Sequence, residues 1–238
     1  MHRKLSCAET VLVLGLVGVF SVFVTIISDL ILLGRPDTAY SFFELGTESM
    51  AGIAQWRITT GTFIGVFMLP FQIAGLISVY HGLKSSGKLL PVLVILADAH
   101  ALLMGVAFHS SYAFIASGWK LFYTAGPDNL NMSEIMQKFD FYWKLIIIIM
   151  LAELIFSSTI FVLLVMSGKT LYPKWMALLN PLCIILAMFL VIHPIPAPVG
   201  GFVGPTVLNM ATLAFFIIST VIIYKRLKRQ EVEVKLHV

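Results

Sequence analysis

Six apolar stretches, each close to the length needed to cross a membrane, dominate the sequence. About 20 helical residues cover the roughly 30 Å of hydrocarbon in a bilayer. The stretches occupy residues 10–33, 57–82, 90–117, 142–167, 174–193 and 203–224. Because a backbone exposed to lipid has to satisfy its own hydrogen bonds, each stretch is expected to form a helix. The sequence therefore predicts an all-α integral membrane protein, with six transmembrane helices in one bundle.

The composition supports this fold class and argues against a separate soluble domain. Of the 238 residues, 59% are hydrophobic and 12% are charged, whereas soluble domains carry about 25% charged residues. Residues 1–238 are expected to be a single transmembrane domain, of which residues 225–238 form a basic cytoplasmic tail. Because the basic residues cluster at the ends of the stretches, as in membrane proteins generally, we exclude nucleic acid as a partner and expect the lipid bilayer instead.

Lys and Arg are distributed unevenly between the two sides of this predicted topology. Eleven of the 16 lie on the side that includes both ends of the chain, and five lie on the other side. Since cytoplasmic loops carry the excess of positive charge, we expect both termini in the cytoplasm, with the plasma membrane as the location. Residues 34–56 are expected to lie in the headgroup region, and 118–141 to be a loop with a helix start at Asn131.

Ionisable side chains within the apolar stretches are the candidate functional residues. At 1.5 Å per helical residue, one group lies in the outer half or near the centre of the bilayer, and Asp98 lies on the inner side. The first group comprises Asp29, Arg57, His109, Glu153 and His193. A charge that faces lipid at mid-depth costs about 2.5–3.5 kcal/mol, so these side chains are expected to converge on one outward-facing polar cavity. Arg57 is the expected counter-charge for Asp29 or Glu153.

Helical spacing places some polar residues relative to one another. Asp98 and His109 are 11 residues apart in the sequence, which is close to three helical turns. They are predicted to share one face of their helix, and Gly105 leaves room between them. His100 points away from Asp98 and is interpreted as a structural residue bonded to a neighbouring helix. In the second stretch, residues 61–65 form a GxxxG motif, which permits close helix packing inside the bundle.

Three functions fit this pattern of polar residues. The first is transport or binding of a small molecule or ion, with Glu153 as the group that couples a proton or cation and Arg57 as the contact for an anion. The second is an enzyme acting on a lipid, in which Asp29, His109, His193 and Glu153 supply metal ligands or an acid–base set. The third is a b-type haem protein with His109 and His193 as axial ligands.

The sequence contains no motif that decides among these functions. The nucleophile motif Gly-x-Ser-x-Gly, the P-loop and the dinucleotide-binding GxGxxG are all absent from it. Neither a cofactor nor an oligomeric state follows from the residues. Transport or binding of a small-molecule or lipid ligand is therefore the first hypothesis, and the membrane-embedded enzyme is the alternative.

Overall fold

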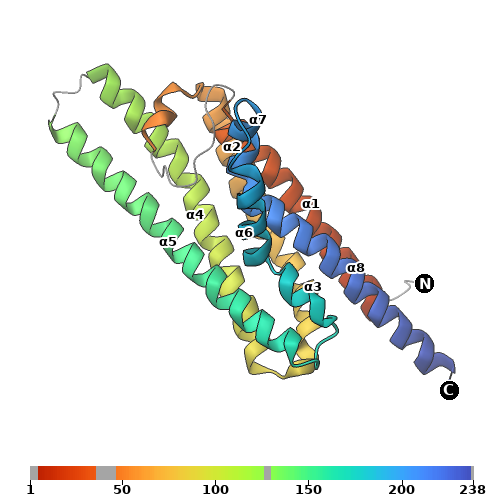
Figure 1. The fold of residues 1–238 in the computed structure, drawn as a ribbon. Helices are drawn as coiled ribbons and strands as arrows, with labels where there is room; N and C mark the ends of the chain where they lie inside the picture. Colours follow the sequence, from red (N-terminus) through yellow and green to blue (C-terminus); the bar gives the residue numbers. More distant parts are fainter. Residues whose placement is uncertain (1–4, 36–46, 126–129, 237–238) are drawn as a thin grey trace.

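The computed structural model describes residues 5–35, 47–125 and 130–236, which form α-helices, short 3₁₀ helices and turns. The α-helices are α1 (Cys7–Leu33), α2 (Gln55–Met68), α3 (Gln72–Leu83), α4 (Leu89–Ala125), α5 (Leu130–Met166), α6 (Pro181–Ile192), α7 (Val199–Val203) and α8 (Val207–Leu236). The 3₁₀ helices are η1 (Glu48–Gly52), η2 (Leu69–Phe71), η3 (Lys84–Ser86), η4 (Lys174–Leu179) and η5 (Gly204–Thr206). Figure 1 shows an elongated bundle with both chain ends at the same end.

Five helical segments within the described residues are long and apolar enough to cross a membrane. They are Cys7–Leu33, Gln55–Ser86, Leu89–Ala125, Asn131–Met166 and Val199–Val234. These segments correspond to all the predicted stretches except 174–193, and the prediction of an all-helical fold is confirmed. The second segment changes to a 3₁₀ turn at Pro70, because a proline inside a helix lacks an N–H donor and clashes with the preceding turn.

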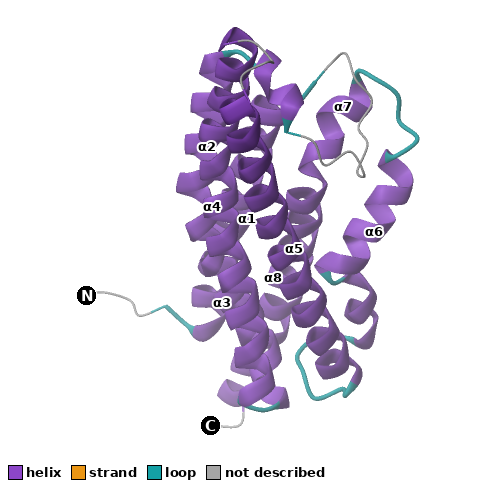
Figure 2. Cartoon of the chain, turned by 90° about the vertical axis from the view of Figure 1, so that its left-hand side faces the viewer, coloured by secondary structure: helices purple, strands orange, loops and turns teal. Residues whose placement is uncertain are grey.

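The stretch 174–193 is not one continuous helix, contrary to the prediction. The 3₁₀ helix η4 ends at Leu179, Asn180 is extended with ψ of 158°, and α6 has only 12 residues, which is about 18 Å of helix. The buried Asn180 side chain accepts a hydrogen bond from the N–H of Cys183 at 3.1 Å, and Pro181 follows it in the first turn. An asparagine cap followed by proline is a helix start, so the break follows from local sequence. Figure 2 shows α6 and α7 at one side of the bundle.

α4 and α5 form a hairpin of two 37-residue helices, each about 55 Å long. The predicted loop is therefore wrong from 118 to 125, because these residues belong to α4, whereas α5 begins at Leu130. A helix start close to Asn131 is confirmed. The connection at 34–56, predicted to lie in the headgroup region, falls partly outside the described residues, which exclude 36–46.

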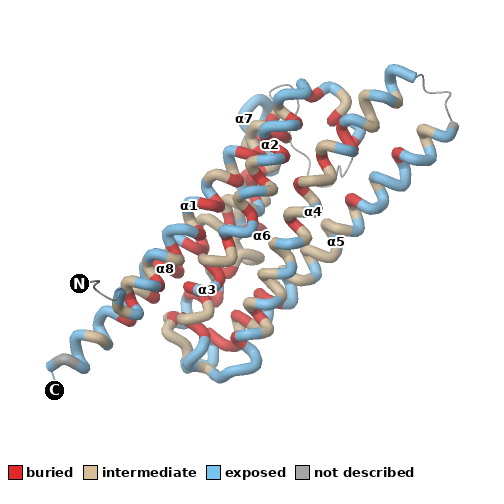
Figure 3. The backbone as a smooth tube through the Cα atoms, turned by 180° about the vertical axis from the view of Figure 1, so that it is seen from behind, coloured by how far each residue is buried: buried red, intermediate tan, exposed pale blue. Residues whose placement is uncertain are grey.

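A glycine contact allows α1 to approach α3 closely. A Cβ added to Gly18 would lie 2.6 Å from the Cα atom of Gly75, so the two backbones are in direct contact. The GxxxG motif at 61–65 packs inside the bundle as predicted, because its first glycine lies against Leu32 of α1. α8 runs alongside α1, and buried residues follow the inner faces of α1, α3 and α8 (Figure 3).

Candidate functional site

A cavity of about 870 Å³ lies inside the helix bundle. Helices α1, α3, α4, α5, α6 and α8 all contribute to its wall, and most of the lining side chains are aliphatic or aromatic. Away from the end that is lined by η1, the polar lining residues other than Tyr and Trp are Asp29, Gln72, Asp98, His109, Asn209 and Thr212. The site is thus an apolar chamber that contains a small set of polar groups.

Asp29, His109 and Asn209 meet at the cavity wall from three different helices. The amide Nδ2 of Asn209 in α8 donates a hydrogen bond to Oδ2 of Asp29 in α1 at 2.7 Å. Nε2 of His109 in α4 lies 3.4 Å from the other carboxyl oxygen, and the side chains of Asp29 and His109 are only 5% and 6% exposed. One buried carboxyl group therefore connects three helices that are far apart in the sequence.

Gly65 on α2 provides the space that His109 occupies. A Cβ at Gly65 would lie 2.2 Å from Nδ1 of His109, so the imidazole packs directly on the α2 backbone. Nδ1 is buried and has no hydrogen-bond partner among the described residues, and the same holds for the indole N–H of Trp143, which also belongs to a lining residue. Buried polar atoms without a protein partner are uncommon in native proteins, and two of them occur at this wall.

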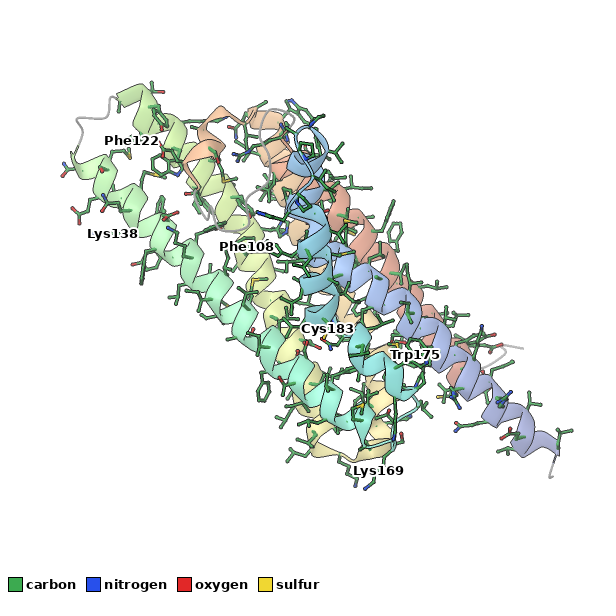
Figure 4. All side chains as sticks on the ribbon, in the orientation of Figure 1. Phe108, Phe122, Lys138, Lys169, Trp175 and Cys183 are labelled. Atoms are coloured by element: carbon green, nitrogen blue, oxygen red, sulfur yellow. The ribbon has the colours of Figure 1, made fainter. Side chains whose placement is uncertain are left out.

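Aromatic rings cover the wall beside His109. Phe108, labelled on α4 in Figure 4, stacks on Trp143 of α5 with 5.3 Å between the ring centroids. Tyr112 lies edge-on to His109 at 6.0 Å. Tyr112 and Trp143 are buried, and all three aromatic residues line the cavity. An aromatic surface therefore adjoins the cluster around Asp29.

The face of α4 predicted from helical spacing does line the cavity. Asp98, Gly105 and His109 all lie on its wall. His100 points away from Asp98, as predicted, since it does not line the cavity and its side chain is 57% exposed. Helical periodicity was sufficient here, because all of these relations lie within a single helix.

Glu153 does not line the cavity, although the sequence predicted that it would. Its Oε1 atom forms a hydrogen bond with Nδ1 of His100, which confirms that His100 bonds to a neighbouring helix. The other carboxyl oxygen of Glu153 is buried and has no partner among the described residues. Glu153 lies close enough to Asp98 for their charges to interact. Because Asp98 lines the cavity and Glu153 does not, Glu153 lies behind the cavity wall.

Arg57 does not pair with Asp29 or Glu153, and that prediction is wrong. Its Nε donates a hydrogen bond to the carbonyl of Ile31 at 2.6 Å, and Nη2 donates to the carbonyl of Gly34. These carbonyls belong to the end of α1, where the last turn of a helix leaves acceptors without partners and favours a positive charge. The guanidinium group of Arg57 is therefore hydrogen-bonded to the backbone at the end of α1.

His193 is exposed at the end of α6 and stacks on Phe189 with 5.3 Å between the ring centroids. It is not among the described residues that line the cavity, whereas His109 is. The two imidazoles predicted as axial haem ligands therefore do not face a shared space. In the ranges that the structure describes, no group of three or more His, Cys, Asp or Glu side chains is arranged to hold a metal ion.

Sequence reasoning did not single out Gln72 and Thr212, which both line the cavity. Gln72 is buried, and its Nε2 donates to the hydroxyl of Thr25 in α1 at 3.2 Å. An amide inside an apolar stretch is a usable signal, since such groups form hydrogen bonds between helices. The partner helix, however, follows only from the three-dimensional packing.

The end of the cavity that is lined by η1 is more polar than its interior. Residues 47–52, which include η1, and Arg35 line this end. The hydroxyl of Tyr123 donates a hydrogen bond to the carboxylate of Glu48. The backbone N–H of Arg35 donates to the carbonyl of Gly201 at 3.1 Å. Charged groups therefore lie at this end of the cavity.

The fold and the cavity define a class of helical proteins that enclose a largely apolar chamber with one buried carboxyl cluster. Within that class, the chain belongs to a family described as a family of unknown function (DUF6796), which matches residues 1–226. The comparisons with curated proteins and with solved structures gave no match. All the cavity residues named above fall inside the matched region.

Proposed function

We propose that the protein is an integral membrane protein whose chain crosses the bilayer six times. The five long apolar segments provide five crossings. The sixth is the broken segment η4 and α6, which carries the chain back along the bundle between α5 and α7 (Figure 1). Large apolar side chains stand on the surface, among them Phe20, Phe67 and Leu190, which are 63%, 64% and 76% exposed. Lipid stabilises such a surface, whereas water does not.

The distribution of charge supports a cytoplasmic location for both termini. The plasma membrane is the proposed location of the protein. Lys169 lies at the lower end of the bundle, and Phe122 and Lys138 lie at the opposite end (Figure 4). The two chain ends also lie toward the lower end (Figure 1). Eleven of the 16 Lys and Arg residues belong to that side, which the positive-inside rule assigns to the cytoplasm.

Within this topology, the cavity is proposed to bind an amphipathic small molecule, and the protein is proposed to act as its carrier. The observation that carries this proposal is the chamber of about 870 Å³ with the Asp29 carboxyl cluster set in a mostly apolar wall. Small-molecule pockets typically measure about 300–1,000 Å³ and combine apolar lining with a few placed polar groups. An apolar body would fill the chamber, and a polar head would contact the cluster.

Interrupted helices at the cavity favour a carrier over a protein that only stores its ligand. Leu69 in η2, Pro181 at the start of α6 and Pro205 in η5 all line the wall. Transporters typically build their binding sites from discontinuous helices, because the helix ends and the unwound backbone between them present polar groups to the substrate. Three such breaks around one chamber fit that design.

Quenching of Trp143 fluorescence by ω-bromododecanol tests the binding step. Substituting Phe for Trp56, Trp119 and Trp175 leaves Trp143 as the only tryptophan. In lipid nanodiscs, we expect quenching with a saturable component, because a bromine held in the cavity contacts the indole of this lining residue. Probe dissolved in the surrounding lipid adds a component that rises linearly with concentration.

Two phenylalanine variants on one helix provide the control. A Cβ at Gly105 meets only ordinary contacts, at 3.5 Å from Leu69, so the ring of Gly105→Phe extends into the chamber and should abolish saturation. Leu103 is 56% exposed on the outer surface of α4, and Leu103→Phe should leave saturation intact. Purely linear quenching without either substitution, or saturation that survives Gly105→Phe, would contradict the proposed binding.

A further inference from the structure

Apart from the imidazole of His109, the acidic groups of the cavity interior have no basic counterpart in its described wall. Asp29 and Asp98 both line the chamber. Among the described lining residues, the single Lys or Arg is Arg35, which follows the end of α1 at the end of the cavity that is lined by η1. Arg57, the cation nearest to Asp29 in the sequence-based arrangement, is bonded to backbone carbonyls of α1 instead. The interior wall is therefore acidic.

A buried carboxylate is stable only when a positive charge or several donors compensate for its lost hydration. Asp29 receives one hydrogen bond from Asn209 and has one longer contact with His109. Protonated, the carboxyl is neutral and needs no cation. Ionised, it has no Lys or Arg partner among the described residues. A bound cation would supply the missing charge and would favour the ionised form.

The aromatic residues that line the cavity beside this carboxyl group also favour a cation. Phe108, Tyr112 and Trp143 line the cavity next to His109. The faces of aromatic rings carry negative electrostatic potential and attract organic cations, most strongly where water is excluded. A carboxyl group and aromatic rings in one cavity wall provide two kinds of group that attract positive charge.

We propose that the ligand is an organic cation, a protonated or quaternary amine that carries an apolar body. This assignment rests on the proposed carrier function and specifies its substrate class. The cationic head lies against Asp29 and the aromatic wall, while the apolar body fills the aliphatic part of the chamber near Leu102 and Met150. Anionic amphiphiles are excluded, because the interior offers them no cation and presents two carboxyl groups.

Charge-selective labelling of a cysteine in the cavity tests this assignment. Gly105→Cys places a thiol on the wall at a position where a Cβ fits without close contacts. The background carries Cys7→Ser and Cys183→Ala, which removes both native cysteines. Three reagents of one chemistry are compared in zwitterionic nanodiscs: neutral methyl methanethiosulfonate, its trimethylammonioethyl analogue and its sulfonatoethyl analogue. Each rate is divided by the rate of the same reagent with free mercaptoethanol.

The cationic reagent is expected to react faster than the anionic one by about tenfold after this normalisation, the effect of a difference of roughly 1.4 kcal/mol in local free energy. Asp29→Asn should reduce that ratio severalfold, since it removes the charge and keeps the shape. Glu134→Gln is the matched control. Its carboxylate is exposed, pairs with Lys138 and does not line the cavity, so the ratio should not change.

The outcomes separate the two proposals. Equal normalised rates for cation and anion, or an unchanged ratio in Asp29→Asn, would overturn the cationic assignment while the neutral reagent still reports an accessible cavity. If the neutral reagent also fails to modify Gly105→Cys in folded protein, the chamber does not open to small molecules. That result would overturn the proposed carrier function and the ligand class with it.

Discussion

Replacing Gly18 with alanine is expected to destabilise the protein by about 3 kcal/mol, the upper end of the usual range for overpacking. The new Cβ would lie 2.6 Å from Cα and 2.8 Å from N of Gly75. Both atoms belong to the backbone of α3, so no side chain can rotate away to relieve the collision. The contact can be restored to normal distance only if α1 and α3 move apart.

A second glycine provides the control for this prediction. A Cβ at Gly105 would lie 3.5 Å from its nearest neighbour in Leu69, and alanine is a better helix former than glycine by about 1 kcal/mol. Gly105→Ala should therefore leave the free energy of unfolding unchanged or raise it slightly. Denaturation in mixed micelles measures both variants. Equal stability of Gly18→Ala and the unmodified chain would show that α1 and α3 do not pack as described.

Relations within one helix were predictable from the sequence, whereas of the five side chains expected to converge from different helices only Asp29 and His109 line the cavity. Asp98 and His109 share a face of α4 and line the cavity, as the spacing of 11 residues predicted. Depth along a helix and angle around it follow from 1.5 Å and 100° per residue. The rotation of one helix relative to another is set by packing, which is why Glu153 faces His100 instead of the cavity.

Arg57 illustrates a competing interaction that the prediction underestimated. An arginine near a buried aspartate suggests an ion pair, but the exposed carbonyls at the end of α1 offer acceptors at the same depth. A helix end without partners for its last carbonyls is costly in an apolar environment. The arginine satisfies that demand, and Asp29 remains available to the cavity.

The break between η4 and α6 shows a different limit. Hydropathy alone predicts that 174–193 is a span, because Asn180 is the one strongly polar residue between 175 and 192. The local signal, Asn180 followed by Pro181, is a helix start in the middle of that stretch. A capping residue inside an apolar stretch therefore predicts a helix start there, just as it does at the end of a stretch. Here Asn180 and Pro181 place the start of α6 at the cavity wall.

The single substitution Asn209→Leu is expected to lower the free energy of unfolding more than the double substitution Asp29→Leu and Asn209→Leu. Asn209→Leu leaves the Oδ2 atom of Asp29 without its 2.7 Å donor in a buried site, at a cost of about 1–3 kcal/mol. In the double variant Asp29→Leu and Asn209→Leu, both polar groups are replaced by apolar ones. Such a replacement is often nearly neutral, so the double variant should be more stable than Asn209→Leu alone.

A double-mutant cycle with Arg57 separates this cluster from the ion pair that the sequence suggested. Asp29 and Asn209 should show a coupling energy of about 1–2 kcal/mol, as expected for residues in direct contact. Asp29 and Arg57 should show almost none, because the guanidinium bonds to Ile31 and Gly34. Unfolding in mixed micelles gives all the required free energies. Strong coupling to Arg57 together with none to Asn209 would mean that Asp29 is neutralised within the protein, and the chamber would then have no unpaired carboxyl with which to attract a cation.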